Sequence, residues 1–178
     1  MRGGASTISA LALAELCYRT LLADGTGALE AMAAQQVTPA LERIVEANTL
    51  LSGLGFESSG LAAAHAIHNG LTVTEDTHPY MHGEKVAFGV IVQLMLESQP
   101  ESIVDEVLAF STSVGLPVTF AGIGLEEPGP EVLDRIARRA TAPGETIHNE
   151  PFAVTPESVI DALRAANAAG ERFRVTPK

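Results

Sequence analysis

The chain has 178 residues, and its 22 acidic and 11 basic side chains give a formal net charge of −11 at neutral pH. This charge repels phosphate backbones and anionic headgroups, so we expect neither a nucleic-acid nor a membrane partner. The longest apolar stretch, Val86–Leu96, is too short to span a bilayer. No secretory signal is recognisable, and the single Cys17 is typical of a reducing compartment, so the cytoplasm is the expected location.

Composition and the spacing of caps and glycines predict an all-α protein. The chain lacks Trp and has only six Phe and two Tyr, which disfavours a β-sandwich. Start and stop signals predict helices from Ser6 or Thr7 to Asp24-Gly25, from Thr38-Pro39 to Leu51, from Ser58 or Ser59 to Asn69-Gly70, from Gly83 to Ser98, from Pro100 or Glu101 through Phe110, from Pro130 through Ile136, and from Thr155-Pro156 to Gly170. Residues 83–98 are apolar on nearly every side, as in a central helix, and Pro117–Phe120 is a weak strand candidate.

Four of the five histidines lie between Gly55 and Lys85. His65 and His68 share one face of a predicted helix, and His82 stands where the next long helix begins. A helix, a loop and a second helix start can bring His65 and His82 to one point, where neutral imidazoles would hold zinc or iron. On spacing alone, hydrogen-bonded or surface imidazoles are the more common interpretation of such a pair.

The remaining candidate motifs favour structural roles. His78 next to Pro79 is typical of a solvated loop, and His148 of a structural turn. Ser58-Ser59-Gly60 reads as a helix cap, because no strand and nucleophile elbow surround it. Gly122-Ile123-Gly124 lacks the third glycine and the βαβ context of a dinucleotide fingerprint.

Longer words of sequence carry a family resemblance. GFESSGLAAAHAIHNG, followed by HGEKVAFG, resembles the carboxy-terminal domain of glycerol dehydrogenases, in the iron-containing (group III) alcohol dehydrogenase superfamily. The likeness extends through LALAELCYRTLL, VTPALERIVEANTLLSGLGFES and GETIHNEPFAVTPESV. It implies a helical bundle like the carboxy-terminal domain of dehydroquinate synthase-like enzymes. We expect residues 1–178 to form one metal- and substrate-binding domain, with the amino-terminal dinucleotide-binding domain absent.

The resemblance also implies roles for individual residues. His65 and His82 correspond to catalytic metal ligands for zinc or iron, and Phe56 together with His65 to substrate-binding positions. His68 corresponds to a histidine near the metal and is assigned to cofactor binding. The family's third ligand is an Asp in a segment with no counterpart here, so a water, Glu57 or Glu84, or another subunit would have to supply an oxygen.

The implied activity is NAD-dependent oxidation of glycerol to dihydroxyacetone, with metal-assisted hydride transfer to NAD. We expect the chain to be a truncated form that is inactive alone and that needs a complementing amino-terminal domain. We also expect it to form a homo-oligomer, because the cleft face of the helical domain is otherwise exposed. The alternative is a non-catalytic helical remnant that acts only in oligomerisation or binding.

Overall fold

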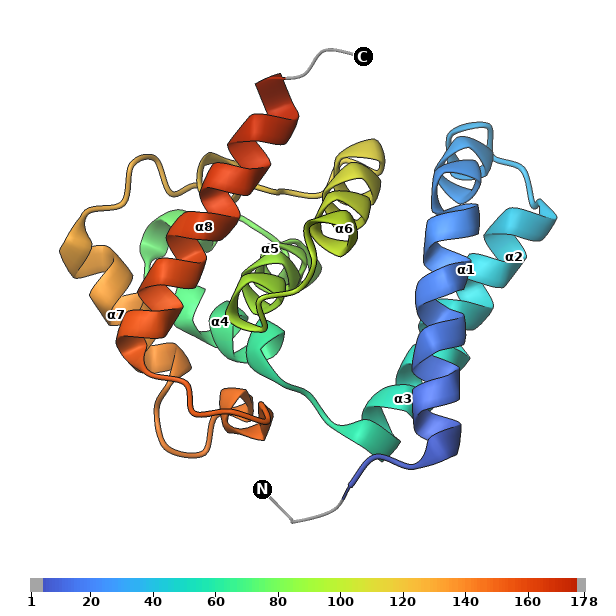
Figure 1. The fold of residues 1–178 in the computed structure, drawn as a ribbon. Helices are drawn as coiled ribbons and strands as arrows, with labels where there is room; N and C mark the ends of the chain where they lie inside the picture. The colour runs from blue at the N-terminus through green and yellow to red at the C-terminus, as the bar shows by residue number, and fades with distance from the viewer. Residues whose placement is uncertain (1–4, 176–178) are drawn as a thin grey trace. The chain divides into compact units, whose positions relative to one another are not determined.

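The computed structural model describes residues 5–175, and every regular element in that range is helical (Figure 1). The helices are α1 (Ile8–Ala33), α2 (Pro39–Glu46), α3 (Ser52–Ser59), α4 (Ala63–Leu71), α5 (His82–Leu96), α6 (Glu101–Ser113), α7 (Pro130–Ala140) and α8 (Pro156–Val175), with shorter helical segments η1 (Ala47–Leu51), η2 (Glu75–Thr77), η3 (Ala121–Ile123) and η4 (Thr146–Asn149). The prediction of an all-α protein is confirmed. The chain divides into two compact units, one up to Gly60 and one from Leu61 onward.

The first unit is a helical hairpin in which α1 packs along α2, η1 and α3. The predicted stop at Asp24-Gly25 is wrong, because α1 continues to Ala33. A helical glycine costs about 1 kcal/mol relative to alanine. Packing offsets this cost, since Ala28 and Ala31 beyond the glycine are buried. Asp24 also accepts two hydrogen bonds from the Arg43 guanidinium on α2, at 2.7 and 2.6 Å, which lower the pKa of its carboxyl group.

The second arm of this helical hairpin is one continuous helical run from α2 through η1 to α3. Its π-helical segment η1 presents the Ala47 carbonyl, which accepts a hydrogen bond from the Cys17 thiol at 3.6 Å. The serines at 58 and 59 end α3 instead of capping the next helix, so that predicted start is wrong. Gly60 stops the helix at φ 83°, a left-handed conformation that favours glycine.

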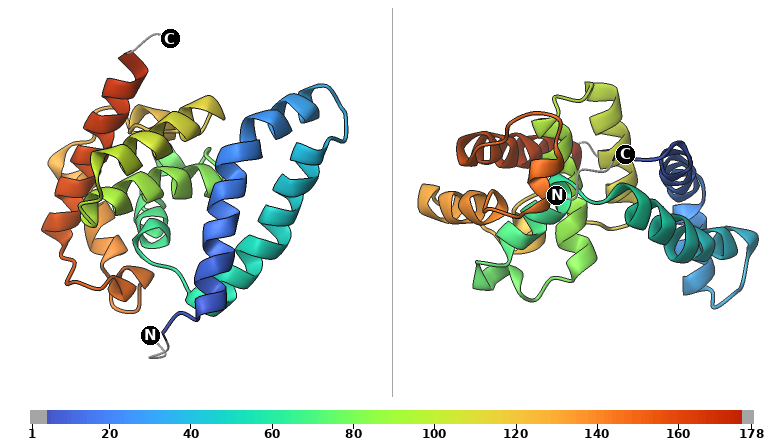
Figure 2. Two further views of the ribbon diagram at one scale, coloured as in Figure 1. Left: turned by 45° about the vertical axis from the view of Figure 1, so that its right-hand side comes forward. Right: turned by 90° about the horizontal axis from the view of Figure 1, so that it is seen from below.

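The second unit is built around α5, which contacts α4, α6 and α8 (Figure 2), while α7 packs on α4 and α8. Phe88, Ile91 and Val92 on α5 are fully buried, so the prediction of a central helix is confirmed. Glycines permit the close approach of its neighbours. A Cβ on Gly89 would lie 2.4 Å from the Ala64 carbonyl oxygen of α4. The absence of a side chain at position 89 therefore lets the backbones of α4 and α5 come into direct contact.

The loop after α6 packs closely on α8, and two expectations for these segments are wrong. Pro117–Phe120 is a loop, not a strand, and the Phe120 amide donates to Asn167 of α8 at 2.7 Å. The predicted stop at Gly170 is also wrong, because α8 continues to Val175. Gly170 is buried where the loop crosses α8, and a Cβ there would lie 1.9 Å from the Val118 carbonyl oxygen. The glycine therefore serves a close approach within the helix and does not end it.

Candidate metal centre

The contact between α4 and α5 brings three histidines together. His65 and His68 lie one turn apart on α4, and His82 is the first residue of α5. The ring centroids of His65 and His82 are 5.6 Å apart with an interplanar angle of 48°, and those of His68 and His82 are 4.3 Å apart. The sequence predicted this convergence of His65 and His82 from the helix, loop and helix pattern.

Hydrogen bonds distinguish the three rings. His82 Nδ1 lies 3.0 Å from His68 Nε2, and His68 Nδ1 lies 3.1 Å from the side-chain oxygen of Asn69. Within the described residues, the His65 ring takes part in no hydrogen bond, although it lies beside His82. His65 and His82 therefore each have a ring nitrogen without a protein partner, as a ligand to an added ion requires.

The environment favours neutral imidazole. Partial burial lowers the pKa of His65, and the neighbouring His82 and His68 lower it further. Burial is also the main cause of the lowered pKa of His68, with His82 and Lys85 contributing and the Asn69 hydrogen bond opposing. Divalent metals bind the neutral ring, so the site holds these two histidines in the form that zinc or iron accepts.

These shifts predict that the metal-free chain loses stability on acidification. Since the folded pKa values of His65 and His68 are lowered, the unfolded chain binds more protons below about pH 6.5. The stabilisation is complete above that pH and is lost as the pH falls toward the folded pKa values. We expect thermal unfolding in a chelator to show a lower midpoint at pH 5.5 than at pH 7.5, and a smaller decrease in the variant His65→Gln/His68→Gln.

Comparing the two proteins separates the effect of the histidines from that of Glu150, whose pKa shift changes stability with pH in the opposite direction. Burial raises the pKa of Glu150, so this residue favours the folded state as the pH falls. Glu150 is present in both proteins, and its contribution cancels in the difference. Equal pH dependence of the two proteins would contradict the histidine assignment.

Comparison with known proteins identifies the relatives of this chain. No family model matches it. It is 55% identical over 173 residues to a glycerol dehydrogenase of Escherichia coli O6:H1 and 51% identical over 172 residues to a glycolaldehyde reductase of Halobacterium salinarum; each alignment covers 97% of this chain and 47% of the relative. The crystal structure of glycerol dehydrogenase from Schizosaccharomyces pombe matches with a TM-score of 0.93 and 38% sequence identity, over 97% of this chain and 44% of that one. The chain is homologous to the glycerol dehydrogenases.

The chain spans about half the length of these glycerol dehydrogenase relatives and corresponds to their carboxy-terminal part. The resemblance read from its sequence and the helical domain that it implied are confirmed. Within the described residues, no helix is both long and apolar enough to cross a membrane.

The structure also places other residues that the glycerol dehydrogenase resemblance singled out. Phe56 lies on α3 of the first unit, with 47% of its surface exposed, and not in the unit that carries the histidines. Glu84 accepts a hydrogen bond from the Met81 amide at 2.7 Å, which caps the start of α5. Across residues 5–175, no group of three or more His, Cys, Asp or Glu side chains is arranged to hold a metal ion. Within residues 5–175, His65 and His82 are therefore two candidate ligands without a third beside them.

The remaining histidines have the structural surroundings that the sequence favoured. His78 is exposed, and its Nε2 lies 3.1 Å from the Thr72 carbonyl oxygen. His148 lies in η4 with its Nε2 3.2 Å from the Ala142 carbonyl oxygen. Neither ring lies beside the His65–His82 pair, so both serve as controls for it.

Residues 145–150 hold the start of α4, a role that was not predicted. Thr146 donates to the Ala62 carbonyl at 2.8 Å, and Asn149 donates to the Leu61 carbonyl at 2.7 Å. Buried Glu150 accepts the Ala63 amide hydrogen bond at 3.0 Å. These contacts satisfy backbone groups at a helix terminus that lacks a local cap. In the sequence, this segment was visible only as the GETIHNEPF part of the family resemblance.

A buried lysine fixes the loop that leads to His82. Lys85 is 6% exposed, and its ammonium group donates to the Thr77 carbonyl at 3.2 Å. Thr77 in turn donates to the Leu71 carbonyl at the end of α4, at 2.7 Å. The turn between α4 and α5 is thus pinned at both ends, which fixes His82 relative to the helix that carries His65.

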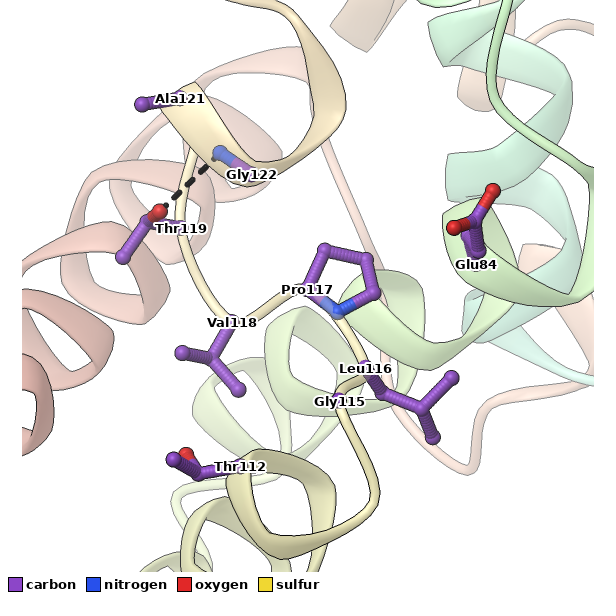
Figure 3. A pocket seen from close by; sticks show the side chains of 9 residues that line it. All are labelled: Glu84, Thr112, Gly115, Leu116, Pro117, Val118, Thr119, Ala121 and Gly122. Carbon is purple, nitrogen blue, oxygen red and sulfur yellow. Dashed lines mark hydrogen bonds between the residues drawn. The ribbon is translucent and has the colours of Figure 1, made fainter. Parts of the chain in front are cut away.

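A separate cavity of about 340 Å³ lies between the start of α5 and the loop that follows α6 (Figure 3). Glu84 borders it from α5, and most of its wall comes from the loop that follows α6, including Pro117. Thr119 stabilises that loop by accepting the Gly122 amide hydrogen bond at 3.2 Å. None of the histidines lines this cavity, so it is distinct from the candidate metal centre.

Proposed function

We propose that the chain is the metal- and polyol-binding half of an NAD-dependent glycerol dehydrogenase. The observation that carries the proposal is the pair His65 and His82, which face one another across the α4–α5 contact with centroids 5.6 Å apart. Its support is the 55% identity to the Escherichia coli glycerol dehydrogenase over nearly the whole of this chain. We propose glycerol, or a similar small polyol, as the substrate.

His65 and His82 would hold the metal ion, with zinc as our choice and iron as the alternative. When bound, the ion supplies a positive charge that lowers the pKa of a substrate hydroxyl group. The lowered pKa of His65 keeps its ring neutral, and the Lys85–Thr77 contact keeps His82 facing it. We assign a supporting position near the ion to His68 and a substrate-contacting position to Phe56.

We assign NAD binding to a polypeptide segment other than residues 5–175. Dinucleotides bind at the carboxyl ends of parallel strands in βαβ units, and the described elements are all helical. Residues 5–175 would therefore act together with a dinucleotide-binding half. We place this reaction in the cytoplasm, as the composition indicates.

Complementation tests this proposal. With zinc, glycerol and NAD, we expect no NADH formation from the 178-residue chain alone and clear formation after addition of the amino-terminal remainder of the Escherichia coli relative. Glycolaldehyde with NADH forms a second arm, because one relative is a glycolaldehyde reductase. Absorbance of NADH measures both arms.

Two outcomes would contradict the proposal: full activity of the chain alone, or no activity in the complemented mixture with zinc present. Size-exclusion chromatography of the same samples reports association. Several apolar side chains of the first unit are exposed, among them Ile8 at 89% and Val37 at 79%, which supports assembly with a second copy or with the complementing half. A chain that associates but neither binds zinc nor restores activity would be the non-catalytic helical remnant.

A further inference from the structure

A continuous row of polar side chains connects His82 to the surface of α7. His82 Nδ1 lies 3.0 Å from His68 Nε2, and His68 Nδ1 lies 3.1 Å from Asn69 Oδ1. The Asn69 amide nitrogen donates to Glu145 at 2.9 Å, and Glu145 also accepts a hydrogen bond from Arg139. The links join imidazole, amide, carboxylate and guanidinium groups, so the direction of one hydrogen bond restricts the next.

The carboxylate of Glu145 sets the direction at the outer end of this row. Burial raises its pKa, but hydrogen bonds from Asn69 and Arg139 outweigh that effect and the net pKa is lowered. An ionised carboxylate only accepts hydrogen bonds. The Asn69 amide must therefore turn its NH₂ group toward Glu145, which leaves its Oδ1 facing His68.

The direction then passes through the two rings. Because Asn69 Oδ1 can only accept, His68 Nδ1 must carry the hydrogen in a neutral ring. His68 Nε2 is then an acceptor, and the hydrogen between the rings must belong to His82 Nδ1. In a neutral His82 ring, the Nε2 atom consequently keeps its lone pair.

We propose that Glu145 and Asn69 are positioning residues that act through His68 to hold His82 in the Nδ1–H tautomer, so that Nε2 is its metal-ligating nitrogen. The proposal rests on the proposed function, in which His82 is a ligand. It gives His68 a defined task as the link between Asn69 and His82. Hydrogen-bond partners of ligating histidines typically change metal affinity by roughly 10–100-fold when removed.

The test is ¹⁵N–¹H correlation spectroscopy of the metal-free 178-residue chain at pH 8, which reports the protonated nitrogen of each histidine ring. We expect the Nδ1–H form for His82 and for His68 in the wild-type chain. In Glu145→Gln the side chain at 145 can donate as well as accept, and Asn69→Leu removes the amide. In both variants we expect His82 to shift toward the Nε2–H form, and zinc affinity measured by calorimetry to decrease roughly 10–100-fold.

Two further variants separate positioning from simple structural damage. The double variant Asn69→Asp/Glu145→Gln places an acceptor opposite His68 and a donor opposite that acceptor, so we expect it to restore the wild-type tautomer and most of the zinc affinity. Asn149→Leu removes a contact to the Leu61 carbonyl, just before α4, but Asn149 lies outside the row. We expect it to leave the tautomer of His82 unchanged.

The proposal is overturned if wild-type His82 carries its hydrogen on Nε2, or if Glu145→Gln and Asn69→Leu both leave the tautomer unchanged. Failure of the proposed function has a different signature. In that case the wild-type chain shows the Nδ1–H form of His82 and binds no zinc. The tautomer readout thus supports or overturns the positioning role regardless of the calorimetric result.

Discussion

Replacing either His65 or His82 with alanine is expected to abolish tight zinc binding. Each variant removes one of the two imidazoles that face one another across the α4–α5 contact. Loss of a direct ligand should exceed the effect of losing its hydrogen-bond partner, so we expect affinity to decrease by more than about 100-fold. Calorimetric titration of the metal-free chain with zinc measures this change directly.

His78→Ala is the matched control for these two variants. His78 lies in the loop between the same two helices, but its ring contacts the Thr72 carbonyl and not the other histidines. We expect its zinc affinity to equal that of the wild-type chain, and circular dichroism of all the metal-free variants to show the same helix content. An equal loss of affinity in His78→Ala would overturn the choice of ligands.

The largest effect on stability is expected from Gly170→Ala. The added Cβ would lie 1.9 Å from the Val118 carbonyl oxygen and 3.0 Å from a Thr119 methyl group, so the loop after α6 must move away from α8. That movement would weaken the hydrogen bond between the Phe120 amide and Asn167. Overpacking of this kind costs about 1–3 kcal/mol, and the backbone contact places this variant at the upper end of that range. Urea-induced unfolding measures the loss.

Gly83→Ala provides the comparison for this variant. Gly83 is also helical, but nothing lies within 4 Å of an added Cβ. Alanine is the better helix former by up to about 1 kcal/mol, so we expect unchanged or slightly increased stability. If Gly170→Ala were as stable as Gly83→Ala, the close approach of the loop to α8 would not be a constraint on this position.

The sequence predicted helix starts better than helix ends. Thr38-Pro39, Pro130 and Pro156 begin helices as expected, because caps and first-turn prolines act locally. Gly25 and Gly170 were read as stops but lie inside helices. At both positions, tertiary packing outweighs the local cost of glycine, and a single sequence contains no direct signal of that packing.

At the candidate site too, contacts between residues close in the sequence were predicted, whereas contacts between distant residues were not. The succession of a helix, a loop and a second helix start predicted that His65 and His82 could meet, and their ring centroids lie 5.6 Å apart. The roles of Asn69 and Glu145 were not predicted, because their hydrogen bond joins positions 76 residues apart. No periodicity links such positions, and only the folded arrangement of α4 and η4 shows that they meet.

The attachment of α4 to residues 145–150 also constrains the order of events during synthesis. The contacts from Thr146, Glu150 and Asn149 to the start of α4 span 84, 87 and 88 residues of sequence. Contacts of such long range close large loops, and their entropic cost is met late in folding. The helix bearing His65 therefore acquires its final orientation only after residues 146–150 have left the ribosome, so any metal ion that His65 and His82 hold would bind after that point.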